Sequence, residues 1–128
     1  MSIFEINKWL KWLQQKDNPF NQIPNNGIVG IISNASNEDI LIISRKNNNI
    51  DIRTSKIKQE TRNPIVDIVF IINKRHFDLI LNNNFQQFRD LINDNQLTAQ
   101  PLISIEKLQT KNYIPFIGKT GLTIKVNK

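Results

Sequence analysis

The chain has 128 residues and a formal net charge of +6, from 17 lysine and arginine residues and 11 aspartate and glutamate residues. Because it has no cysteine, disulfides, thiol catalysis and cysteine-ligated metal sites are excluded. Its single histidine excludes histidine-rich metal sites. No apolar run reaches the ~18 residues of a membrane span. No basic segment followed by an apolar one opens the chain, so we expect no secretory signal. We therefore expect one domain over residues 1–128, in the cytoplasm or inside a host cell, with no membrane partner.

Isoleucine and asparagine are unusually frequent, with 23 and 19 residues. Their codons, like those of lysine, are AT-rich, so the sequence indicates a low-GC genome, either of a bacterium or of its virus. Codon bias is therefore an alternative source of the positive charge. The asparagine tracts at 25–26, 47–49 and 82–84 are predicted to form turns, because asparagine tolerates the left-handed conformation and bonds to its own backbone.

The first predicted element is an N-terminal helix. Its evidence is a set of apolar residues at helical spacing, namely Ile3, Ile6, Leu10 and Leu13. Ser2 and Glu5 are expected to form its capping box. Trp12 lies off the apolar stripe. The helix is expected to end before Asp17, because a proline follows at position 19 and the residue before a proline avoids the helical conformation.

Four strands are predicted next. Apolar runs at 28–32 and 39–45 indicate buried strands, and the second run is long enough for a strand covered on both faces. Alternation over 49–54 predicts a strand that forms a hairpin with the preceding one. The polar segment 55–63 is expected to be an exposed loop. The most apolar strand is expected at 65–72.

The second half of the chain is predicted to add two helices and two strands. Asn73 is expected to cap a short helix ending at 82–84, and residues 85–92 form a second amphipathic helix. Strands are expected at 102–106 and 122–126. This order predicts a single α+β domain. Its mainly antiparallel sheet would have five to six strands, with the N-terminal helix and the two short helices packed on one face.

Catalytic motifs are incomplete in this sequence. The Gly118-Lys119-Thr120 triplet has the last letters of a phosphate-binding loop, but Tyr113 stands where the first glycine is needed, so a tight turn is predicted there. Asp39, Asp51 and Asp67 lie on predicted strands and are interpreted as solvent-facing residues. We expect no catalytic residue, no metal and no cofactor. A divergent metal-dependent nuclease, in which these carboxylates converge on a cation, is the catalytic alternative.

Positive charge is concentrated in two segments. Residues 45–62 hold six basic and two acidic residues, and residues 107–128 hold five basic residues and no acidic residue. If the two segments are neighbours in the fold, they form one basic face that attracts phosphate backbones without reading sequence. We therefore predict a non-catalytic binding protein whose partner is nucleic acid or, second, an acidic protein surface. The candidate contact residues are Arg45, Lys46, Arg53, Lys56, Lys58, Arg62, Lys107, Lys111, Lys119 and Lys125.

A second hypothesis is a protein-interaction or inhibitor module. The predicted strand 122–126 can pair with another chain if it lies at a sheet edge. Whichever of Trp9 and Trp12 is not buried is the candidate anchor for such a partner, with Trp12 the choice made here, because tryptophan is enriched at binding hot spots. Lysines at positions 125 and 128 equally suit an edge that is protected against aggregation.

A third hypothesis rests on the order of elements from Ile65 to Ile105. A strand, the Asn73 cap, a helix with Phe77-x-x-Ile80 and a helix with Phe85-x-x-Phe88 follow one another. This order resembles that of sterol-carrier-protein-2-like domains, although the tail beyond residue 107 departs from it. The resemblance implies an apolar tunnel enclosed by helices and sheet, and therefore a carrier of an apolar ligand.

Overall fold

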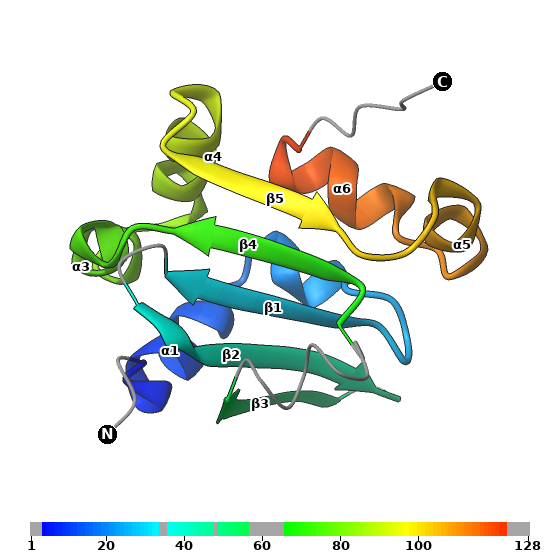
Figure 1. The fold of residues 1–128 in the computed structure, drawn as a ribbon, viewed down its shortest axis with the longest axis horizontal. Coiled ribbons are helices and arrows are strands. Elements are labelled where there is room, and N and C mark those ends of the chain that lie inside the picture. The colour runs from blue at the N-terminus through cyan, green and yellow to red at the C-terminus, as the bar shows by residue number, and fades with distance from the viewer. Residues whose placement is uncertain (1–3, 34–35, 48, 57–65, 123–128) are drawn as a thin grey trace.

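The computed structural model describes residues 4–33, 36–47, 49–56 and 66–122. The strands in these residues are β1 Ile28–Ser33, β2 Ser36–Lys46, β3 Asn49–Lys56, β4 Ile68–Ile72 and β5 Leu97–Pro101. They form one sheet in the order β3-β2-β1-β4-β5 (Figure 1). β1 and β4 are parallel, and the other neighbours are antiparallel. The expected α+β class with a mainly antiparallel sheet is confirmed.

The helices pack on one face of this sheet, behind it in Figure 1. They are α1 Ile6–Leu13, α3 Phe77–Leu81, α4 Phe85–Asn93, α5 Ile105–Thr110 and α6 Ile114–Thr120, with 3₁₀ turns η1 Pro19–Gln22 and η2 Lys74–His76. Among the described residues, no helix has the length and apolar character needed to cross a membrane.

Aromatic rings fill the core between the helices and the sheet. Trp9 and Trp12 from α1, Phe20 from η1 and Phe70 from β4 are all at most 1% exposed. The ring centroid of Phe20 lies 5.4 Å from that of Trp12 and 5.4 Å from that of Phe70. The structure therefore contradicts the hypothesis that Trp12 is an exposed anchor. Although Trp12 lies off the main apolar stripe of the helix, its side chain faces the ring of Phe20 rather than solvent.

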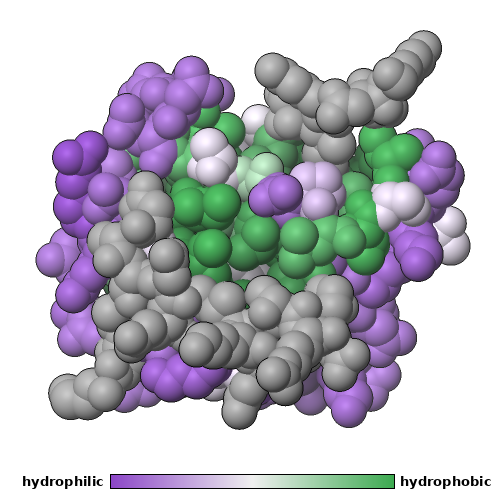
Figure 2. Space-filling view, in the orientation of Figure 1, coloured by the Kyte–Doolittle hydropathy of each residue, from purple (hydrophilic) through white to green (hydrophobic). Residues whose placement is uncertain are grey.

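The opposite face of the sheet carries a second, smaller apolar cluster. Its buried members are Ile40, Ile42, Val66 and Val69. Figure 2 shows apolar side chains gathered on this side, which faces the viewer. Ile40 to Ile43 are all at most 5% exposed. The expectation that this run is a strand covered on both faces is therefore confirmed.

The tight turn predicted at Gly118-Lys119-Thr120 is wrong, because these residues lie in the helix α6. Pro115 lies in the first turn of the helix, where a missing N–H costs no helical hydrogen bond. Gly121 follows with φ of 83°, the left-handed conformation that commonly ends helices. So short a helix is not stable alone. Phe116 holds it in place, because its ring is fully buried and lies 5.5 Å from that of Phe20.

The last described strand is also displaced from its prediction, from 102–106 to Leu97–Pro101. Pro101 ends the strand rather than opening it, and Ser104 then caps α5 by accepting a hydrogen bond from the Lys107 N–H at 3.2 Å. Leu97 is the only buried side chain in β5, so the strand depends on its pairing with β4. The strand predicted at 122–126 lies outside the described residues, except for Leu122, which is not in a strand.

The predicted turns at 25–26 and 47–49 and the predicted Asn73 cap are confirmed. Asn26 and Asn47 adopt φ of 66° and 58°, as expected for left-handed turns. Asn73 caps the η2 turn by accepting a hydrogen bond from the Arg75 N–H at 3.1 Å. The N-terminal helix, by contrast, begins at Ile6 with no side-chain cap. The expected cap, Ser2, lies outside the described residues.

Candidate functional site

A groove of about 550 Å³ runs along β5, at one edge of the sheet. Five consecutive residues of β5, Leu97–Pro101, line it together with Ile68 of the neighbouring strand. Ile92, Asn93 and Asn95, at the end of α4 and just after it, also line the groove. Gly121 and Leu122, just after α6, complete the lining. Figure 1 shows α4 and α6 beside β5.

The lining is apolar or polar without charge. None of the described lining residues is acidic or basic. Ile68 and Leu97 belong to the main core, and Ile92, Ala99 and Leu122 pack against it. A volume of this size falls within the ~300–1,000 Å³ of small-ligand pockets. Burying an unpaired charge there would be costly, so the groove suits an uncharged ligand.

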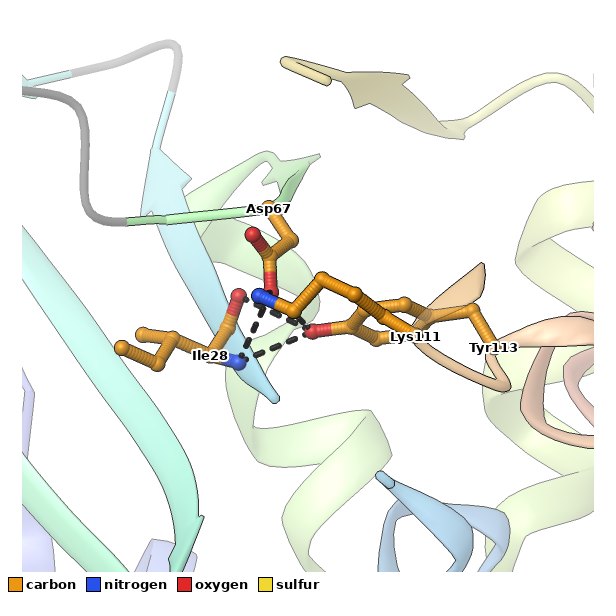
Figure 3. Close-up of polar contacts among 4 residues, drawn as sticks. All are labelled: Ile28, Asp67, Lys111 and Tyr113. Carbon is orange, nitrogen blue, oxygen red and sulfur yellow. Dashed lines mark hydrogen bonds and ion pairs between the residues drawn. The ribbon is translucent and has the colours of Figure 1, made fainter. Parts of the chain in front are cut away.

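A buried polar cluster lies elsewhere on the sheet, where β1 and β4 begin (Figure 3). The Oδ2 atom of Asp67 accepts hydrogen bonds from the Tyr113 hydroxyl at 2.5 Å and from the Ile28 N–H at 3.2 Å. Lys111 Nζ lies 2.7 Å from the same oxygen. The Tyr113 hydroxyl also accepts from the Ile28 N–H at 2.8 Å. The cluster therefore ties the link between α5 and α6 to the sheet.

This cluster is suited to holding structure rather than to proton transfer. Tyr113 is fully buried, and burial, together with its hydrogen bond to Asp67, raises the pKa of its hydroxyl far above the ordinary value. A phenol with such a pKa remains protonated at physiological pH. Gly27 is needed beside it, because a Cβ at that position would lie 2.7 Å from the Tyr113 hydroxyl oxygen.

Stability should fall at alkaline pH because of Tyr113. Its ordinary pKa is 10.0, and the folded pKa is raised. The stabilisation is therefore complete below pH 10 and is lost as the pH rises, since the unfolded state ionises first. We expect the free energy of unfolding to fall by up to about 1.4 kcal/mol per pH unit above about pH 10. Urea denaturation at rising pH measures this slope, and Tyr113→Phe should remove it. Equal slopes in both proteins would show that Tyr113 ionises in the folded state.

Several of the basic residues proposed as contacts are used within the chain. The Arg45 guanidinium donates to the main-chain oxygens of Asn21 and Ile23, at 3.3 and 3.1 Å. Lys56 Nζ lies 2.8 Å from the Asp39 carboxylate, and Lys111 pairs with Asp67 as described above. Lys58, Arg62 and Lys125 lie outside the described residues.

The two basic segments start from opposite edges of the sheet, but Lys111 reaches its middle, where it pairs with Asp67 at the start of β1 and β4. Arg45, Lys46, Arg53 and Lys56 lie on β2 and β3, at one edge. The residues of the other segment, Lys107, Lys111 and Lys119, follow β5, which forms the other edge (Figure 1). β1 and β4 lie between β5 and the hairpin. Binding of nucleic acid or of an acidic protein surface by these residues stays a prediction.

The carboxylates considered for a nuclease do not form a shared site. Asp39 and Asp67 are each 5% exposed and pair with lysines, whereas Asp51 is exposed. The interpretation of Asp39 and Asp67 as solvent-facing residues is therefore wrong, because each is buried with a basic partner. Within the described ranges, no group of three or more acidic residues and histidines could hold a metal ion.

Sequence reasoning missed the groove. Its residues come from β5, the end of α4 and the segment after α6. Of these three, only β5 has a sequence feature that indicates the edge of a sheet. The one readable signal was Pro101, because proline in a sheet is confined to edges and strand ends.

Comparisons with known proteins give similarities among solved structures but none among protein families or curated sequences. No protein-family model matches the chain, and no curated protein sequence matches it. Among solved structures, it is similar to a chain described as the UbiJ-SCP2 ubiquinone synthesis protein, with a TM-score of 0.46 and 14% sequence identity. The similarity covers 86% of this chain and 78% of that chain.

Proposed function

We propose that the chain is a non-catalytic carrier that binds an uncharged, largely apolar ligand in the groove along β5. The observation that supports the proposal is the groove itself, which combines a volume of about 550 Å³ with described lining residues that carry no charge. A ligand there would rest on Ile68 and Leu97, which are 1% and 2% exposed and part of the main core. The groove wall is therefore packed before the ligand arrives, which reduces the entropic cost of binding.

The remaining lining residues have the character of a binding site. Ala99 and Leu122 are only partly buried, so a ligand would remove apolar surface from water at about 25 cal/mol per Å². Asn93, Asn95 and Gln100 are exposed and present amides at the same groove. Amides placed around an apolar surface orient a ligand without demanding that it be charged.

Filling the groove should abolish binding. Ala99 has the smallest side chain on the core-facing side of β5, so Ala99→Trp is expected to weaken binding of the neutral dye Nile red at least about tenfold. Dye fluorescence measures the affinity. Thr98 is exposed and also lines the groove, so Thr98→Trp is a second blocking variant that leaves the core intact.

Gln109→Trp is the matched control, because Gln109 is exposed on α5 and is not a lining residue. This variant should bind the dye like the wild type. If both blocking variants fold and also bind the dye like the wild type, the groove is not the ligand site. Mass spectrometry of the purified chain under native conditions would show a bound apolar molecule directly.

A further inference from the structure

The main-chain hydrogen bonds of β5 show which of its groups face the groove. Leu102, next along the chain, donates its N–H to the main-chain oxygen of Asp67 at 2.8 Å. In an antiparallel pair, alternate residues direct both main-chain groups to the neighbouring strand. Gln100 and Thr98 lie two and four residues before Leu102. Their main-chain N–H and C=O groups therefore point to β4, where their partners are Val69 and Ile71.

It follows that the main-chain groups of Leu97, Ala99 and Pro101 point away from the sheet. β5 is an edge strand, and all three residues line the groove. Leu97 and Ala99 each present an N–H and a C=O, and Pro101 presents a C=O alone. Nowhere in the described part of the chain does a residue bond to these outward groups. Pro101 is tolerated because its missing N–H would have faced the edge rather than the ladder.

The two edges of the sheet differ in how they are protected. The outer strand β3 carries Asp51, Arg53 and Lys56, and charges of this kind deter pairing with another chain. β5 contains no charged residue. Its outward donors and acceptors lie in a groove whose described lining residues carry no charge. A ligand that satisfies them needs alternating acceptors and donors at the spacing of a strand, and it must be neutral.

We propose that the ligand of this groove is an extended, uncharged peptide segment with apolar side chains, which adds to β5 as a sixth strand. The proposal deepens the proposed function and rests on it. Ala99 and Leu97 would each donate to and accept from the peptide backbone, while apolar side chains contact Ile68 and Leu122. The five residues of β5 span about 17 Å, which sets the length of the paired segment.

The test uses the full chain and a short peptide of alternating threonine and valine, acetylated and amidated so that it carries no charge. We expect this peptide to displace Nile red from the groove. The same peptide with N-methylated central amides lacks the donors for strand pairing, and we expect it to bind at least about tenfold more weakly. Peptide binding should also slow hydrogen exchange at the Leu97 and Ala99 amides. The Thr98 and Gln100 amides, which face β4, should be protected already in the free protein.

A pair of variants at Ala99 separates the hydrogen bond from the shape of the groove. Ala99→Pro removes the outward N–H and leaves the ladder to β4 intact, whereas Ala99→Val adds similar bulk and keeps the N–H. Ala99→Pro should lose at least about tenfold more peptide affinity than Ala99→Val. The two variants should bind Nile red with the same affinity as each other, because the dye needs no main-chain N–H.

The other outcomes would overturn the inference in distinguishable ways. If Nile red binds but the peptide neither displaces it nor protects Ala99, the peptide proposal is wrong and the apolar carrier stands. If neither the dye nor the peptide binds, the proposed function fails as well. If the free chain sediments as a dimer with the Leu97 and Ala99 amides already protected, a second copy of β5 is the occupant instead.

Discussion

Replacing Asp67 with alanine is expected to lower the free energy of unfolding by about 3 kcal/mol. Asp67 is 5% exposed, and its carboxylate accepts hydrogen bonds from Tyr113, Lys111 and the Ile28 N–H. Without it, the fully buried Tyr113 hydroxyl keeps only the main-chain oxygen of Ile28, at 3.5 Å, as an acceptor. A buried donor left so poorly satisfied costs more than a typical hydrogen bond contributes. Urea denaturation followed by circular dichroism measures the change.

Two smaller substitutions serve as controls for the cluster. Lys111→Met should cost about 1 kcal/mol or less, because the Lys111 side chain is 35% exposed and its pair with Asp67 is partly screened by water. Tyr113→Phe should cost about 1.5 kcal/mol, since it removes the hydrogen bond to the charged Asp67, while the Ile28 N–H that also bonds to the hydroxyl keeps Asp67 as an acceptor. If Asp67→Ala is no more destabilising than Lys111→Met, the cluster does not hold α5 and α6 on the sheet.

Trp12→Ala is expected to destabilise the protein by about 3–5 kcal/mol, as for truncation of a large buried aromatic side chain. Trp12 is 1% exposed, and its ring centroid lies 5.4 Å from that of Phe20 and 5.7 Å from that of Phe85. Deleting the indole leaves a cavity that this layer of rings cannot close. Thermal and urea unfolding, both followed by circular dichroism, measure the loss.

The neighbouring residue provides the control for this core position. Lys11 is exposed on the same helix, so Lys11→Ala should change stability by no more than about 0.5 kcal/mol. Trp12→Phe should cost less than Trp12→Ala, because it keeps a ring and removes an indole N–H for which no described residue is an acceptor. A Trp12→Ala protein as stable as the wild type would restore the hypothesis of an exposed anchor.

The strands of the first half were predictable because their patterns are strong and their partners are close in sequence. β2 contains an unbroken apolar run, and β3 alternates between exposed and partly buried residues. The two strands pair through the hairpin that the asparagine turn predicts. The apolar pattern, the asparagine turn and the strand pairing all favour the same hairpin, so the prediction from local sequence agrees with the fold.

The second half was harder to predict because its elements are short and depend on distant partners. β5 has one buried side chain, and its place at the edge follows from pairing with β4. The seven residues of α6 cannot form a stable helix alone. Proline in the first turn and glycine after the end marked this helix, yet packing of Phe116 on Phe20 is what stabilises it.

The sequence by itself determined the α+β class, the turns at asparagine and the excess of positive charge, because these depend on composition and on neighbours a few residues apart. Only the tertiary structure decided that Asp67 is buried, since its partners Lys111 and Tyr113 are 44 and 46 residues away in sequence. The same holds for Trp12 and for the groove. A side chain is buried, and a strand is left at an edge, only when segments distant in sequence have packed around it.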